Sequence, residues 1–598
     1  MKLFSETPKT DTLAVLLGLT FIVLGWLSFV LAASSVFLFI FVICGLAVTL
    51  ILAAFICGKL LIRAPLDLKV ALVVTFAFAS LVGYFSEPTF FSGRDQGSIA
   101  EAAFRLAQNG QLTFNTPVSG SFFKIYGAGT ALNFPGFAYT KAGDLITQFP
   151  LGYTAWLSSF IVLFGLHGPA IGNALLLFLF LFSFYNLLRL FVHQYYAFCG
   201  LALAIFSFLP MWFSKFTLSE NLSVFLFTFL VWNLILFWRS GEWLFYMNVL
   251  GTAGLLVFTR IEGFAFLGLT LIILLVNPRT RRLWHAHPWN SLVFPFLIFT
   301  LFFLRNFFIN LPYYTMIGKA FLKFCHQLGA VHSASDLGQM NNPLTLGAVF
   351  LLYGLLAIFS LGFLGILAFI KEKRWLLLLP AVLAFPTFIY FFDPNISLDH
   401  PWMLRRYLFS LFPSLLFSAT VGLALIFAKE KNLPLDKPQG KRLLCVSLIF
   451  LGMLILQYPA WNAGIFFAEN PSLLKQVAAF SQEFSDKDLI LVDRNATGDG
   501  FAMLTGPAQF LFGKNAVYFF NPYDLASLDT APFEHVYLLT PEADQARYVA
   551  VFGERLVFRK TVTFSLQQLE NLSLESQSPL RLPEKTTRET RDFLFQIY

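Results

Sequence analysis

The chain has 598 residues, of which 57% are hydrophobic and 12% charged, and its mean hydropathy is +0.70. This composition excludes a single soluble globule, because repeated apolar runs of about 20 residues are typical of membrane-spanning helices. The net charge of +8 is modest for this length, so it argues against nucleic acid as a partner and for residues that orient spans in a membrane.

The N-terminal part begins with three apolar runs long enough to cross a bilayer, near 12–33, 35–57 and 68–86. Lys2 and Lys9 precede or open the first run, and no cleavage site followed by a soluble domain is present, so we expect an uncleaved first span. The five cysteines have no metal-ligand spacing and predict no disulfide framework.

A hydrophilic first outer loop is predicted at 87–150. Within it, Ser98 to Gln108 is predicted to be a helix, because Ile99 starts an i, i+3, i+4, i+7 apolar pattern. Asp95 comes just before this helix, where a carboxylate caps free backbone N–H groups or faces solvent and a ligand. The local sequence leaves a capping role and a catalytic role equally open.

Ten further apolar segments bring the predicted total to about thirteen spans. They lie near 169–191, 195–212, 219–238, 243–259, 261–277, 290–309, 346–370, 374–392, 405–428 and 442–459. Leu151–Gly165 is apolar but short for a crossing, so we expect an interfacial or partly inserted helix at the outer surface.

The basic residues support this topology. With the N-terminus inside, the predicted inner loops contain Lys59, Arg63, Lys69, Arg189, Arg239, Arg279, Arg281, Arg282, Lys371, Lys373, Arg374, Lys429, Lys431, Lys437, Lys441 and Arg442. This is the positive-inside pattern, and it would break if Leu151–Gly165 crossed fully. Thirteen spans place the C-terminal tail outside, on the same side as Asp95.

The charged residues predicted at outer span ends are exceptions to this pattern. They are Arg94, Asp95, Glu101, Arg105, Lys215, Glu220, Arg260, Glu262, Arg305, Lys319, Lys323, Asp393, Asp399, His400, Arg405 and Arg406. Cations grouped with a few carboxylates at the membrane edge suit an anionic lipid headgroup such as a polyprenyl phosphate, since arginine offers bidentate hydrogen bonds to phosphate. For any single residue, snorkelling or a buried ion pair is an equal alternative.

Five short motifs follow one another on the predicted outer side. They are Arg94-Asp95-Gln96 with the helix SIAEAAFRLAQNG, Gln148–Tyr153 through Phe164-Gly165, Leu209-Pro210 through Ser214–Asn221, Thr259–Gly263, and Arg405-Arg406-Tyr407 through Pro413. Together they resemble the outer-loop motifs of the GT-C glycosyltransferases. That polyprenyl-phosphate-dependent class includes protein O-mannosyltransferases, aminoarabinose transferases and oligosaccharyltransferases.

The resemblance implies that a sugar moves from a polyprenyl phosphate or diphosphate to an acceptor hydroxyl or amide outside the membrane. A hydroxyl nucleophile needs a carboxylate to take its proton, and a departing lipid phosphate needs cations. We therefore expect Asp95 to act as the general base and Glu220 to be the second acid, contacting sugar, acceptor or metal. Arg405 and Arg406 are the expected ligands of the carrier phosphate.

Further residues are expected to bind substrate: Arg94, Glu101, Arg260, Arg305, Lys323, His400 and Tyr407. Gln96 stands where relatives often carry a second acid, so a tight acidic metal pair is missing. Asp95 and Glu220 could still share Mg²⁺ or Mn²⁺, but we favour metal-independent action. The histidines of the outer loops match no metal template, and we expect no metal site there.

The segment 306–345 is long for a connector. It is expected either to be a mobile outer loop that closes over substrate or to contain an amphipathic helix, Met316–Leu328, lying on the membrane. Both descriptions can hold together.

The tail, 461–598, is expected to form a small α/β domain outside the cytoplasm, following the transmembrane domain 1–460. Strands are predicted at Leu489–Asp493, Ala516–Phe520 and His535–Leu539, with helices near 472–484 and 541–551. Residues 493–500 follow the first strand, where α/β domains bind ligands, although a plain strand-to-helix turn explains them better.

The expected protein is thus a multi-pass membrane glycosyltransferase, and a bacterial inner membrane suits its layout. The sequence leaves the sugar open, and the acceptor could be a glycan, a lipid or a protein. A transporter or a flippase for a glycolipid is the alternative, but no internal repeat pairs the two halves of the chain, and the charges gather at one membrane face. A lipid-binding scaffold is a third possibility.

Overall fold

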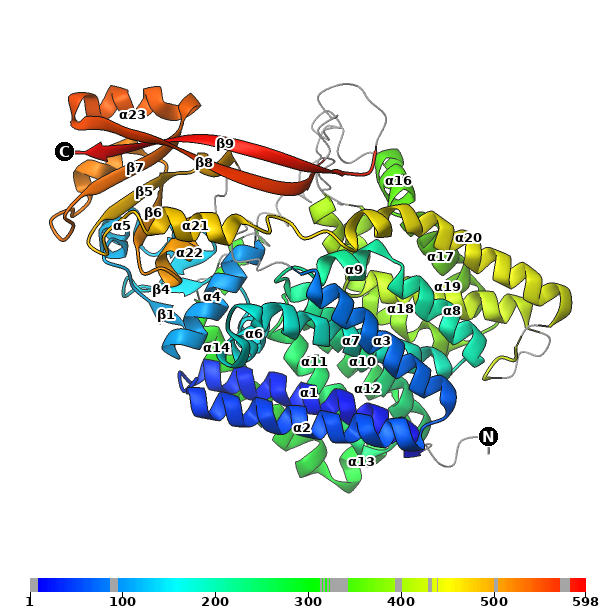
Figure 1. Cartoon of the computed structure of the whole chain (residues 1–598). Coiled ribbons are helices and arrows are strands. Elements are labelled where there is room, and N and C mark those ends of the chain that lie inside the picture. Colours follow the sequence, from blue (N-terminus) through cyan, green and yellow to red (C-terminus); the bar gives the residue numbers. More distant parts are fainter. Residues whose placement is uncertain are drawn as a thin grey trace.

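The computed structural model describes residues 9–86, 95–311, 314–315, 318–319, 322, 343–392, 401–428, 433–437, 439–498, 504–570 and 581–598. Helices form the larger part of the molecule, and a mixed part with β-strands lies against one end of them (Figure 1). The predicted fold class is confirmed: a multi-pass helical membrane part is followed by a C-terminal α/β domain.

The helical part contains α1 (Lys9–Ala33), α2 (Phe39–Arg63), α3 (Leu66–Tyr84), α6 (Leu151–Phe164), α7 (Gly168–Arg189), α8 (Gln194–Ile205), α9 (Phe208–Phe213), α10 (Ser219–Ser240), α11 (Trp243–Val257), α12 (Gly263–Val276), α13 (Pro278–Ala286), α14 (Phe294–Ile309), α16 (Pro343–Leu352), α17 (Leu355–Lys371), α18 (Leu379–Ala384), α19 (Leu411–Phe427) and α20 (Gly440–Gly464). Among the described residues, seven helical stretches are long and apolar enough to cross a membrane, or nine if each of two bent pairs forms one span. Shorter apolar helices occupy the other predicted spans, so the count of thirteen stays a prediction.

Two predicted spans have different local structure from that expected. The span predicted at 346–370 consists of α16 and α17, whose axes are bent by 109°. Gly354 lies at this bend with φ +70°, and a Cβ there would come within 2.6 Å of the Gln457 backbone, so the close turn requires glycine. The span predicted at 405–428 begins as the 3-10 helix η7 (Pro401–Tyr407), and its α-helix starts only at Leu411.

Helix α6 is the apolar segment that was expected at the outer surface. Its residues from Leu151 to Ile161 are buried, and it packs against α1, α7 and the outer-loop helix α4 (Asp95–Asn109). An all-round apolar surface is typical of a helix covered on every side. The segment is therefore an internal helix of the bundle.

The first outer loop folds as a compact unit. Helix α4 covers the helix predicted there, and it is followed by β1 (Thr113–Phe114), α5 (Ser119–Tyr126), β2 (Gly129–Thr130), β3 (Phe137–Tyr139) and β4 (Leu145–Thr147). The short strands form an antiparallel sheet in the order β1-β4-β3-β2. These strands are too short to give an alternating sequence pattern, and the sequence did not predict them.

The C-terminal domain has a five-stranded sheet in the order β6-β5-β7-β9-β8. Its strands are β5 (Leu489–Asp493), β6 (Asn515–Phe519), β7 (Val536–Pro541), β8 (Leu556–Glu570) and β9 (Glu584–Ile597), and its helices are α21 (Leu473–Ser481), α22 (Thr505–Phe510) and α23 (Gln545–Phe552). Strands β6, β5 and β7 are parallel, and β9 and β8 add an antiparallel hairpin. The hairpin was missed although β8 alternates buried Val562, Phe564 and Leu566 with polar residues, as a half-buried strand does; only β9 begins with a wholly polar stretch, at 584–592.

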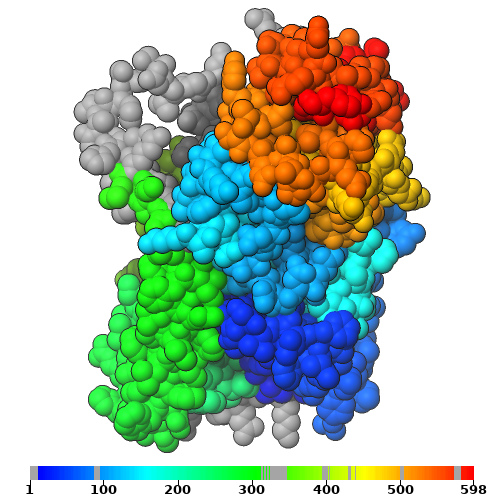
Figure 2. All heavy atoms as spheres, turned by 90° about the vertical axis from the view of Figure 1, so that its left-hand side faces the viewer, coloured from blue at the N-terminus to red at the C-terminus, as the bar shows by residue number. Residues whose placement is uncertain are grey.

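The first outer loop and the C-terminal domain share one hydrophobic core. Buried Phe122, Phe134 and Tyr139 of the loop belong to the same cluster as Leu489 and Phe519 of the α/β sheet. In Figure 2 the light-blue outer loop lies between the dark-blue N-terminal helices and the orange and red domain. Two segments that are far apart in the sequence therefore pack as one unit.

Candidate functional site

Charged side chains from four parts of the chain line one cavity of about 480 Å³. The charged residues in its wall are Asp95, Glu220, Arg260, Glu262, Arg405 and Arg406. All six lie in the motifs singled out in the sequence. The packing of the helices thus brings together charged residues that are up to 311 positions apart in the chain.

Local structure explains where the acids sit. Asp95 is the first residue of α4 and Glu220 the second residue of α10, so both carboxylates lie in a first helical turn. The free N–H groups and the positive end of the helix dipole favour negative charge at such positions. Asp95 is therefore positioned at the cavity by a short outer helix, and Glu220 by a helix of the bundle.

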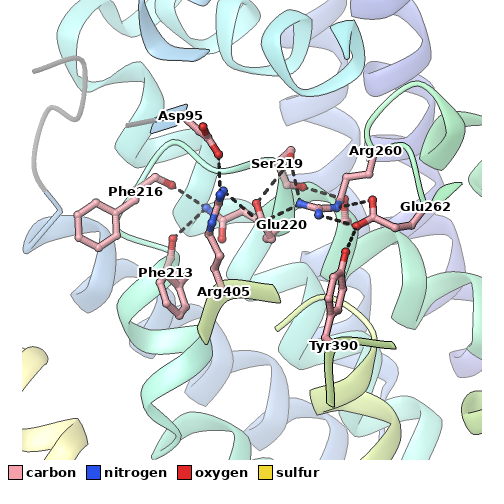
Figure 3. Close-up of polar contacts among 11 residues, drawn as sticks. Asp95, Phe213, Phe216, Ser219, Glu220, Arg260, Glu262, Tyr390 and Arg405 are labelled. Atoms are coloured by element: carbon pink, nitrogen blue, oxygen red, sulfur yellow. Dashed lines mark hydrogen bonds and ion pairs between the residues drawn. The ribbon is translucent and has the colours of Figure 1, made fainter. Parts of the chain in front are cut away.

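Arg405 joins the two acids. Its Nη2 donates to Asp95 Oδ2 at 2.5 Å, and its Nη1 lies 3.4 Å from Glu220 Oε1 (Figure 3). Glu220 Oε1 also lies 2.8 Å from Arg260 Nη1. One buried carboxylate, 1% exposed, thus sits between two guanidinium groups and holds both in place.

Arg260 continues the chain of ion pairs to Glu262. Its Nη2 and Nε donate to the two Glu262 oxygens at 2.8 and 3.1 Å, and the Tyr390 hydroxyl donates to Glu262 Oε1 at 2.5 Å (Figure 3). Burial opposes the charge on each partner, but the neighbouring carboxylates hold the pKa of Arg260 well above its usual value, and Arg260 holds the pKa of Glu262 below its usual value. Both residues therefore stay charged near neutral pH.

Exposure separates the two predicted catalytic acids. The Asp95 side chain is 42% exposed, whereas Glu220 is 1% exposed. A general base must reach the proton it abstracts, directly or through one water. Asp95 meets this requirement, and Glu220 is better placed to orient the arginines.

Arg406 differs from its neighbour. Its guanidinium lies 5.6 Å from the centre of the Tyr390 ring, and none of the described residues forms an ion pair with it. Arg405 is 13% exposed and already engaged by two carboxylates. Among the described residues of the cavity wall, Arg406 is thus the cation without a carboxylate partner.

Three residues expected to bind substrate do not line this cavity. Glu101 pairs with Arg105 at 2.7 Å, Arg305 Nε donates to the Ala33 carbonyl at 3.0 Å, and the buried Tyr407 hydroxyl donates to the Tyr390 carbonyl at 2.6 Å. Glu101 points elsewhere because it lies on the face of α4 that meets the C-terminal domain. The remaining predictions, Arg94, Lys323 and His400, lie outside the described residues, as does most of the proposed mobile loop.

The sequence analysis gave no site role to Glu262, Ser219 or Tyr390. Glu262 could have been predicted from the sequence, because it belongs to the Thr259–Gly263 motif. Ser219 Oγ accepts from Arg260 Nη1 at 3.3 Å. Tyr390 follows an apolar run at the end of the 3-10 helix η6 (Phe385–Phe391), and nothing local marks it.

The acids of the cavity are paired with arginines. Among the described residues, no group of three or more His, Cys, Asp or Glu side chains could hold a metal ion. Asp95 and Glu220, the pair that could have shared Mg²⁺ or Mn²⁺, are bridged by the Arg405 guanidinium. A bound arginine supplies the positive charge that a metal would otherwise bring to these carboxylates.

No family model matches the sequence, and no curated protein matches it. Two crystal structures of ArnT from Cupriavidus metallidurans have a similar chain arrangement at 12% sequence identity. The apo state gives a TM-score of 0.46 over 88% of this chain and 97% of that chain. The state bound to undecaprenyl phosphate gives 0.45 over 89% and 97%. So distant a similarity concerns the outline of the fold alone.

Proposed function

We propose that this chain is a GT-C-type glycosyltransferase that moves a sugar from a polyprenyl-phosphate carrier to an acceptor hydroxyl outside the cytoplasm. One observation carries the proposal: an accessible carboxylate, Asp95, and a cation without an acidic partner among the described residues, Arg406, line the same cavity. A transfer of this kind needs a base on one side of the anomeric carbon and positive charge on the other.

In the proposed mechanism the acceptor hydroxyl lies against Asp95, which takes its proton as the oxygen attacks the anomeric carbon. The bond from that carbon to the phosphate oxygen breaks, and the carrier phosphate leaves with the electron pair. Arg406, with Arg405 beside it, stabilises the growing negative charge, so no general acid is needed. A single displacement of this kind inverts the configuration at the anomeric carbon.

Glu220 and Glu262 act on the arginines in this mechanism. Glu220 lies within 2.8 Å of Arg260 and 3.4 Å of Arg405, and Glu262 holds Arg260 through two hydrogen bonds. Guanidinium groups fixed before the reaction need no reorganisation as charge develops. Because each acid is engaged by an arginine, we propose that no divalent cation takes part. Saturating EDTA should leave turnover unchanged, and lost activity restored by Mg²⁺ or Mn²⁺ would contradict this part.

The experiment that tests the function uses the full chain in lipid nanodiscs and a radiolabelled polyprenyl-phosphate sugar. Mass spectrometry of the copurifying lipid selects the carrier. Asp95→Asn should lower transfer to a hydroxyl acceptor by about 100-fold or more while donor binding is kept. Asp144→Asn is the matched control, because Asp144 lies in the same loop and its carboxylate accepts a hydrogen bond only from Asn115 among the described residues.

The possible results separate the function classes. Transfer that depends on Asp95 supports the proposal. A flippase or transporter would instead move the labelled lipid across a vesicle membrane without transfer, and Asp95→Asn would leave that movement intact. Donor binding with neither transfer nor movement would indicate a lipid-binding scaffold and contradict the proposal. We further propose that the protein works in a bacterial inner membrane with its C-terminal domain outside the cytoplasm.

A further inference from the structure

Helix α4, which carries Asp95 at its first residue, is in direct contact with α22 of the C-terminal domain. The Phe104 and Phe510 rings stack with centres 5.5 Å apart, and Gln108 Nε2 donates to the Phe510 carbonyl at 3.2 Å. At Gly506 a Cβ would come within 2.7 Å of Glu101 Oε2, so α22 approaches α4 as closely as glycine allows. The two helices, about 400 residues apart, form one tight interface.

Arg105 is the polar centre of this interface. Its Nε and Nη2 donate to Glu101 Oε1 at 2.9 and 2.7 Å, and Nη2 also donates to Gln509 Oε1 at 2.7 Å. The guanidinium carbon lies 3.9 Å from the centre of the Phe114 ring. The Arg105 side chain is 11% exposed, so an unpaired N–H group there would be costly. Gln509 is the group that links this buried charge to the C-terminal domain.

The opposite face of α4 is fixed to the membrane part. The Ser158 hydroxyl of α6 donates to the Ala103 carbonyl at 3.0 Å, and the Thr217 hydroxyl donates to the Gln96 carbonyl at 2.6 Å. Thr217 lies three residues before Glu220. The helix is therefore held between the bundle and the domain, and its N-terminal turn places Asp95 beside Arg405.

We propose that Gln509 is a positioning residue, through which the C-terminal domain sets the place of the Asp95 carboxylate in the cavity. Gln509 fixes Arg105, Arg105 fixes the side of α4 that faces the C-terminal domain, and α4 carries Asp95. The C-terminal domain then contributes to the position of the catalytic base. The effect on catalysis rests on the proposed function, whereas the coupling between α22 and α4 does not.

The test compares three variants of the full chain in nanodiscs. Gln509→Leu removes the acceptor for Arg105, and Gln509→Glu keeps an acceptor oxygen at the same position. Gln476→Leu is the matched control, because the Gln476 side chain also makes hydrogen bonds, to Ser565 at 2.8 and 3.0 Å and to Ser472 at 3.0 Å, but within the C-terminal domain. Hydrogen exchange of the backbone amides of 96–106 is measured first, since it needs no activity.

Gln509→Leu should raise exchange in α4 by about tenfold or more, as expected for a lost hydrogen bond to a charged group, while Gln509→Glu and Gln476→Leu leave it unchanged. Unchanged exchange in Gln509→Leu, or an equal rise in Gln476→Leu, would overturn the coupling whether or not the chain is a transferase. In the transfer assay Gln509→Leu should lower kcat by about tenfold with the donor KM within twofold of wild type, and Gln509→Glu should restore kcat. A loss confined to KM would contradict positioning of the base. Absence of transfer by the wild-type chain would count against the proposed function alone.

Discussion

Arg405 donates to Asp95 Oδ2 at 2.5 Å, although 310 positions separate the two residues in the chain. The same guanidinium reaches Glu220 at 3.4 Å. The two acids and the arginine that the sequence motifs brought forward therefore share one ion-pair network. The network pairs Arg405 with Asp95 and Glu220, and none of the described residues forms an ion pair with Arg406.

Arg406 should be the main phosphate ligand, because it forms no ion pair with a described residue. Arg406→Ala should raise the donor KM by about 10- to 100-fold, the loss expected for charge-assisted hydrogen bonds to phosphate. Arg406→Lys should recover part of it, since lysine keeps the charge without the planar fork. Arg282→Ala, at an exposed residue of a predicted inner loop, is the control. Steady-state kinetics with varied donor decide the matter, and an unchanged KM in Arg406→Ala would count against this role.

Glu220→Gln should destabilise the membrane part strongly. The carboxylate is buried between Arg260 and Arg405, so its removal leaves two guanidinium groups with less compensating charge, at a cost of about 3–5 kcal/mol. Thermal unfolding of the purified protein in one detergent measures the effect. Glu542→Gln is the control, because this carboxylate is 61% exposed and lies 3.9 Å from Arg591, and it should change stability by less than about 0.5 kcal/mol. Equal effects in the two variants would refute the structural role of Glu220.

Lys215 should anchor the passage from the membrane part to the C-terminal domain. Its ammonium donates to the carbonyls of Gly464, Ile465 and Phe467 at 2.8, 2.7 and 2.9 Å, where α20 ends. Lys215→Met leaves three buried acceptors without this donor, so we expect a stability loss of about 2–4 kcal/mol and faster proteolysis of the linker after Gly464. Lys141→Met, at an exposed lysine, should behave as wild type. Unchanged proteolysis in Lys215→Met would show that the anchor lies elsewhere.

Asp592 should make the stability of the C-terminal domain depend on pH. Burial raises the pKa of Asp592 from 3.8 to about 6. Between pH 3.8 and about pH 6 the Asp592 carboxyl holds its proton in the folded state more than in the unfolded state. The free energy of unfolding therefore falls as the pH rises through this range, and above about pH 6 the whole destabilising effect of the buried charge is present. Asp592→Asn should therefore raise the unfolding temperature at pH 8 and change it little at pH 4. The exposed Asp486→Asn is the control, and a gain in Asp592→Asn of the same size at both pH values would contradict the prediction.

The predicted orientation can be tested by labelling intact cells. In a variant without the natural cysteines, Lys141→Cys should react with a membrane-impermeant maleimide, because the first outer loop is predicted to lie outside. Arg282→Cys should react only after permeabilisation, because its loop is predicted to lie inside. A third site, Asp486→Cys, reports on the C-terminal domain and should match Lys141→Cys. Labelling of Arg282→Cys in intact cells would show that the predicted orientation is wrong.

Helix positions were predictable because they depend on local patterns. Apolar runs predicted α1, α2 and α3 to within a few residues, and the 3.6-residue period predicted α4. Strands β5, β6 and β7 were predicted because they are buried on both faces and read as continuous apolar runs. The bend at Gly354 was not predicted, since it leaves no such pattern in the sequence. The β8–β9 hairpin was missed although β8 alternates apolar and polar residues from Val562 to Leu566.

The site residues also divide into those that the sequence predicted and those that depend on packing. Asp95, Glu220, Arg260, Arg405 and Arg406 lie in short motifs beside predicted spans, and the structure brings all five into one cavity. Glu101 has the same local character as Asp95, yet it faces α22. On a helix, six positions of separation correspond to more than one and a half turns, so which face meets which neighbour depends on packing.

The sequence by itself determined that the chain is a multi-pass membrane protein with a C-terminal α/β domain, because hydrophobicity over about 20 residues and strand-length apolar runs are local properties. It also marked which charged residues stand at the ends of spans. Only the tertiary structure decided how those charges pair and that Asp95 is accessible while Glu220 is buried. It also decided that the C-terminal domain packs against α4. Pairing and burial depend on contacts between segments hundreds of residues apart, and such contacts leave no trace in the pattern of any one segment.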